Sequence, residues 1–74
     1  MSLADLQRAC NATLRAGLPA SLTATIRRLL ERGESPRAVL AACRKAGATR
    51  RTLTGLAVEA EIEAVTVEIR ARKN

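Results

Sequence analysis

The chain has 74 residues, which allows one domain and no more. It contains no histidine and its two cysteines are far apart, which argues against a zinc site, and it has no aromatic residue, which argues against binding modes that stack nucleobases. The formal net charge of +6, from 13 basic and 7 acidic residues, favours anionic partners. We expect no metal and no cofactor.

The amino-terminal stretch lacks the basic start and apolar run of a secretory signal peptide. No segment approaches the roughly 20 apolar residues that a membrane-spanning helix needs. We therefore expect a cytoplasmic protein that does not contact a membrane. Cys10 and Cys43 each fall on an apolar helix face, and although one disulfide between them stays open, buried free thiols are the preferred interpretation.

Three breaks divide the chain into four predicted helices, at residues 17–19, 33–36 and 47–49. Each break has a glycine suited to the left-handed conformation that follows a helix end. The first helix opens at Ser2, which forms a capping-box pattern with Asp5. Its apolar residues recur at helical spacing and are expected to form a buried stripe: Leu3, Leu6, Cys10 and Leu14.

The second helix is predicted from about Pro19 to Arg32, and the third, short one from Pro36 to Ala46, with Ser35 as its amino-terminal cap. Their apolar residues are expected to face inward and their arginines outward. These inward residues are Leu22, Ile26, Leu29, Leu30, Val39, Leu40 and Cys43. The outward arginines of the two helices either form a solvated face or extend a DNA-facing patch.

The fourth helix is predicted to open at Thr49, a favourable capping residue. It has two apolar rows, which predicts that it packs on two sides. One row (Leu53, Leu56, Ala57 and Ala60) would face its own domain. The other row would face a second chain, and its members are Val58, Ile62, Val65 and Ile69.

The carboxy-terminal stretch has a second interpretation. Apolar and polar residues alternate over 64–72, as in a strand that pairs with the same strand of another copy. We favour the helix because no turn residue follows Gly55. Either interpretation predicts a dimer. Three glutamates before this stretch, Glu59, Glu61 and Glu63, either dock a basic partner or form a solubilising face, and we favour the solubilising face.

The third break has features of two helices joined by a tight turn. Gly47 suits the turn, Cys43 is a small residue four positions earlier, and Ala48 is small and apolar. The inward positions that follow are apolar, and the exposed ones are polar or basic. Residues 39–58 thereby resemble the helix-turn-helix motif of bacterial and phage DNA-binding regulators.

This resemblance implies that the helix from Thr49 is a recognition helix, whose first residues enter the major groove. Arg50, Arg51 and Thr54 would then contact bases or phosphates, since arginine binds guanine edges and phosphates with two parallel hydrogen bonds. Arg44 and Lys45, at the end of the preceding helix, would contact the DNA backbone.

Catalysis is not expected. The chain has no histidine for acid–base chemistry, no serine or cysteine with a base partner, and no phosphate-binding glycine loop.

We expect an all-α single domain over 1–74, a small four-helix fold with a helix-turn-helix at about 36–58 and a long carboxy-terminal helix used for dimerisation at about 58–72. The expected function is sequence-specific binding of double-stranded DNA by a homodimer, as in transcription regulators of bacteria or phages. The alternative is a small helical adaptor or inhibitor that binds a protein partner through its carboxy-terminal helix. Exposure of the start of the recognition helix would favour DNA, and burial of that start would favour the adaptor.

Overall fold

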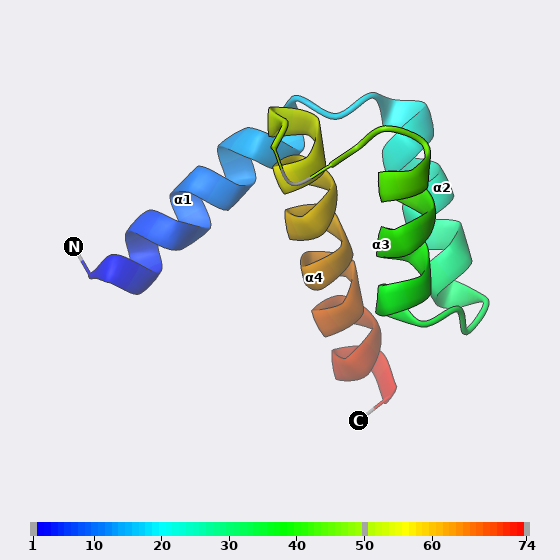
Figure 1. Ribbon diagram of the computed structural model, residues 1–74. Helices are drawn as coiled ribbons and strands as arrows, with labels where there is room; N and C mark the ends of the chain where they lie inside the picture. Colours follow the sequence, from blue (N-terminus) through cyan, green and yellow to red (C-terminus); the bar gives the residue numbers. More distant parts are fainter. Residues whose placement is uncertain (1, 50, 74) are drawn as a thin grey trace.

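The computed structural model describes residues 2–49 and 51–73, which form four α-helices (Figure 1). They are α1 (Leu3–Ala16), α2 (Ala20–Glu31), α3 (Pro36–Lys45) and α4 (Leu53–Lys73). The prediction of an all-helical fold is confirmed. The strand interpretation is wrong, because α4 continues without interruption through residues 64–72.

Side-chain caps begin α1, α3 and α4, whereas α2 follows Pro19 without a side-chain cap. Ser2 accepts a hydrogen bond from the backbone of Asp5, whose carboxylate accepts one in return, so the predicted capping box is confirmed. Ser35 caps α3, also as predicted. The cap of α4 is different: the hydroxyl of Thr52 accepts from the amide of Gly55 at 3.0 Å. The helix therefore begins at Leu53, later than the predicted start at Thr49.

Two of the three break glycines have the predicted left-handed conformation. Gly33 has φ 97° and Gly47 has φ 112°. In both, the glycine and the residue after it donate hydrogen bonds back to carbonyls of the last helical turn, which is the Schellman arrangement. Gly17 does not follow this prediction: its φ is −81°, so the chain leaves α1 in a right-handed conformation.

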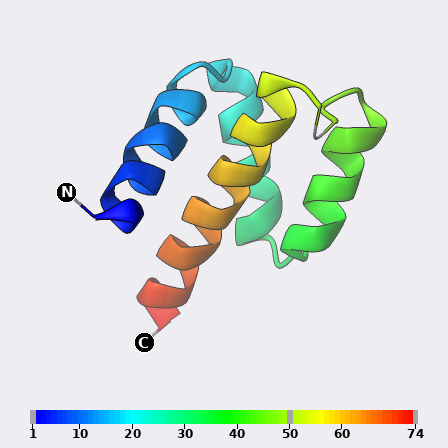
Figure 2. The same ribbon diagram turned by 60° about the vertical axis from the view of Figure 1, so that its left-hand side comes forward.

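The long α4 is the central helix, and the other three pack around it (Figures 1 and 2). α2 and α3 pack on α4 and on each other, whereas α1 lies on the other side of α4 and contacts only this helix among the described elements. α3 and α4 run side by side in opposite directions, so the start of α3 lies near the end of α4.

The core lies between α2, α3 and α4. It consists of buried aliphatic side chains from these three helices: Ile26, Leu30, Val39, Val58, Ile62 and Val65. Val58 and Val65 are fully buried and Ile69 is packed against the core, so the row assigned above to a second chain is buried within one chain. This row is not a free surface because two short helices, α2 and α3, cover it.

The first helix has no buried residue, contrary to the predicted buried stripe. Leu3 is 86% exposed, Leu6 is 49% exposed and Cys10 is also exposed. An ion pair links α1 to α4: the guanidinium of Arg15 lies 3.2 Å from a carboxylate oxygen of Glu61. Glu61 is buried, so its predicted place on a solubilising face is wrong; Arg15 compensates its charge.

Candidate nucleic-acid interface

The residues predicted to contact DNA lie around the connection between α3 and α4, residues 46–52. Lys45, Thr49, Arg51 and Thr54 are all exposed there, and we call these four residues the α3–α4 surface. Lys45 and Arg51 form no ion pair with any residue that the structure describes. Arg50 lies outside the described residues. Two of these four residues carry a positive charge and none carries a negative charge.

Arg44 has a different environment from these four residues. Its guanidinium lies 3.7 Å from the carboxylate of Glu59 on α4, and both side chains are about one-third exposed. One of its terminal nitrogens is buried without a hydrogen-bond partner among the described residues. Arg44 therefore links the end of α3 to α4. Glu59 already compensates part of its positive charge, so Arg44 is less available to a phosphate than Lys45 or Arg51.

The helix that follows the turn, α4, starts at a different residue and buries a different face from the predicted recognition helix. It begins at Leu53 rather than at Thr49, and α3 and α4 run side by side in opposite directions (Figures 1 and 2). Leu53 and Leu56, expected to point inward, are 74% and 42% exposed. Only the first turn of α4 projects beyond its neighbours, because Ala57 and Val58 are already buried.

Gly55 explains how the connection is held against α4. A Cβ atom at this position would overlap the backbone carbonyl of Thr49 and would lie 3.0 Å from the carbonyl oxygen of Ala48. The connecting backbone therefore crosses directly over the first turn of α4, and only glycine leaves room for it. This contact fixes the direction in which Thr49 and its neighbours are presented to solvent.

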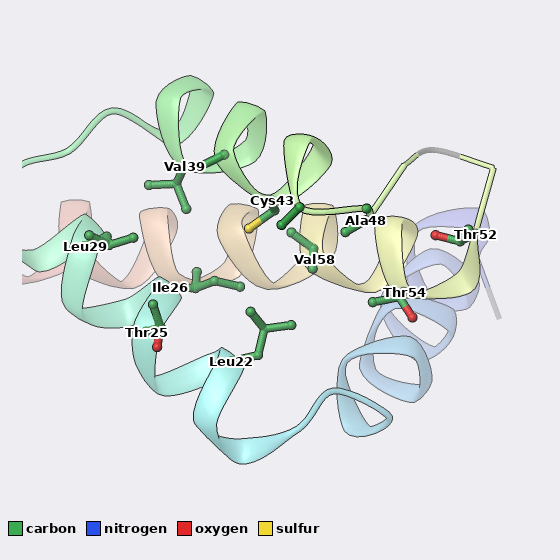
Figure 3. A pocket seen from close by; sticks show the side chains of 13 residues that line it. Leu22, Thr25, Ile26, Leu29, Val39, Cys43, Ala48, Thr52, Thr54 and Val58 are labelled. Atoms are coloured by element: carbon green, nitrogen blue, oxygen red, sulfur yellow. The ribbon is translucent and has the colours of Figure 1, made fainter.

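An apolar groove of about 510 Å³ opens beside the α3–α4 surface, between α2, α3 and the start of α4 (Figure 3). Leu22 and Ile26 of α2 form one wall and Cys43 of α3 the other, with Thr52 and Thr54 at one end. Burial raises the pKa of the Cys43 thiol, so the thiol stays protonated and apolar at neutral pH.

A second basic group lies at the opposite end of the domain. Arg37 of α3 and Arg70 of α4 line one hollow there, and Arg70 and Lys73 line another. Arg28 and Arg32 near the end of α2 are also exposed, and all five form no ion pair among the described residues. These residues come from three distant parts of the sequence, so their proximity was not evident from spacing. They do not widen the α3–α4 surface, because the full length of α3 separates the two groups.

None of the described helices is long and apolar enough to cross a membrane. Within residues 2–49 and 51–73, no three cysteine or acidic side chains come together as metal ligands would. The chain has no match among protein-family models, curated proteins or solved structures.

Proposed function

We propose that this protein is a small DNA-binding protein, of the kind that regulates transcription in bacteria or phages, and that it contacts double-stranded DNA through the α3–α4 surface. The observation that carries the proposal is the exposure of Lys45 and Arg51 beside Thr49 and Thr54, with no carboxylate among them. Free cations can neutralise phosphates and release counterions, and threonine hydroxyls can donate to phosphate oxygens.

The proposed contact differs from that of a complete recognition helix. The exposed connection and first turn of α4 place Arg51 and Thr54 against the groove edge, while the apolar residues of α4 from Ala57 onward pack in the protein's own core. Glu59 and Glu63 on later turns do not oppose this contact as strongly as they would in a recognition helix lying along the groove. Glu59 is also held by Arg44.

The test is fluorescence anisotropy of a labelled mixed-sequence duplex, titrated at several salt concentrations with the wild type and with Lys45→Ala/Arg51→Ala. Each phosphate contact contributes about −0.9 to the slope of log affinity against log salt, so the double variant should reduce the slope by about two. The matched control is Arg28→Ala/Arg32→Ala, which removes the same charge from α2 at the opposite end.

Loss of binding in the first variant, with the control close to the wild type, supports the α3–α4 surface. An equal loss in both variants means non-specific attraction by net charge, and a larger loss in the control moves the contact to the second basic group. Absence of binding by the folded wild type at low salt refutes DNA binding altogether.

The second candidate function is binding of a protein partner, and the apolar groove favours it. The adaptor hypothesis placed this contact on the carboxy-terminal helix, but the apolar row of that helix is buried in the core. The groove between α2 and α3 offers an open apolar surface instead, with Leu22 and Leu29 only partly covered. A duplex titration without binding would make this candidate the leading one.

A further inference from the structure

The single chain exposes more surface than its size requires. Folded monomers of 7.9 kDa expose roughly 4,400 Å², whereas this chain exposes 5455 Å². The excess, roughly 1,000 Å², is comparable to the approximately 800 Å² that each partner buries in a standard protein interface. It comes in part from α1, which packs on one neighbour only and has no buried residue.

The apolar side of α1 is the unpartnered part of this surface. Leu3, Leu6 and Cys10 are exposed along it, and Leu14 continues it to a hollow shared with Leu56 of α4. We call these five residues the α1 face. A soluble monomer normally exposes apolar residues singly, and a contiguous row on one helix marks an interaction site.

The distribution of charge around α1 indicates which kind of partner can dock on the α1 face. On α1 itself the positions that flank the stripe are uncharged, since Gln7 and Asn11 lie on one side and Ala9 and Thr13 on the other. The nearest charges are carboxylates, because Glu59 and Glu63 of α4 line the hollow that Leu14 shares with Leu56. The exposed cations without an ion pair, among the described residues, all lie on α2, α3, α4 or their connections. Two copies of a chain with net charge +6 approach one another with least repulsion on a face that lacks those cations.

The spacing of the stripe also suits self-association. Its residues are separated by three, four and four positions, and the reversed order gives four, four and three. In an antiparallel pair around a two-fold axis that opposes Leu6 with Cys10, Leu3 lies opposite Thr13, one residue or about 1.5 Å along the helix from Leu14. We propose that the α1 face docks a second copy of this chain in this antiparallel arrangement. The proposal does not depend on DNA binding.

The first experiment is sedimentation equilibrium of the full chain over a wide concentration range, without DNA. The wild type should self-associate to a dimer, and Leu6→Lys should weaken this association at least tenfold. The monomer fold should survive the substitution, since no residue of α1 is buried, and circular dichroism checks this. The matched control Ala41→Lys adds the same charge to an exposed position on α3, and it should dimerise like the wild type.

A second measurement tests the orientation. Leu6→Cys places a thiol opposite Cys10 of the second copy, so mild oxidation should give a covalent dimer with two cross-links. Ala12→Cys puts the new thiol on another side of α1 and should cross-link far more slowly. A wild type that stays monomeric at hundreds of micromolar overturns the proposal. A Leu6→Lys dimer as tight as the wild-type dimer moves the interface away from the α1 face and overturns it equally.

Discussion

Replacing Gly55 by alanine tests the close crossing of the α3–α4 connection over α4. The new Cβ would lie 2.5 Å from the carbonyl carbon of Thr49, closer than unbonded atoms approach, and 3.0 Å from the carbonyl oxygen of Ala48. Helix propensity alone favours alanine by about 1 kcal/mol. Overpacking typically costs about 1–3 kcal/mol, and the upper end applies because the obstacle is backbone, which cannot rotate away.

The two effects leave a net loss of about 2 kcal/mol in the free energy of unfolding, which lowers the melting temperature by roughly 8–16 °C in a domain of this size. Thermal unfolding followed by circular dichroism measures the shift. Gly17→Ala is the matched control: its φ of −81° suits alanine and its Cβ would lie 3.4 Å from the carbonyl oxygen of Leu14, an ordinary contact. It should leave stability unchanged or raise it by about 0.4–1 kcal/mol. A Gly55→Ala protein that melts at or above the wild-type temperature would show that the connection does not rest on α4.

Three further outcomes follow from the packing. Arg15→Met should destabilise the protein by about 1–3 kcal/mol, because it leaves the buried Glu61 carboxylate without its partner, and a double variant with Glu61→Gln should recover most of the loss in urea titrations. Ile26→Ala should cost about 2–5 kcal/mol in the same titrations, since this side chain is 1% exposed; a cost below about 1 kcal/mol would contradict the assigned core. Iodoacetamide should alkylate Cys10, which is exposed, faster than Cys43 in dilute protein, because burial raises the pKa of the Cys43 thiol and shields it; equal rates before denaturation would contradict this.

Local signals in the sequence were sufficient for the helices and for most of their ends. The capping residues Ser2 and Ser35, and the left-handed glycines 33 and 47, act on backbone groups within four or five positions of themselves. Such interactions do not depend on the rest of the fold. The start of α4 was misplaced because Thr49 and Thr52 both suit a cap, and the choice between them depends on where the connection crosses Gly55.

The roles of the apolar rows were not predictable from their spacing. α4 has apolar residues on two sides, and periodicity identifies rows without stating which one the chain's own helices cover. The row through Val58 is covered by α2 and α3, so Leu53 and Leu56 are left exposed. Glu61 is a similar case, since its partner Arg15 lies 46 positions earlier and neither residue signals the other.

The attachment of α1 to a single neighbour has a consequence for how the protein opens. Because α1 contributes no side chain to the core, it can detach while α2, α3 and α4 stay packed, and this partial opening costs less free energy than global unfolding. Backbone amides of α1 should therefore exchange with deuterium well before those in the middle of α4. Any partner that covers α1 would slow this exchange selectively, so the rate of exchange in α1 reports occupancy of its exposed side without a label or a substitution.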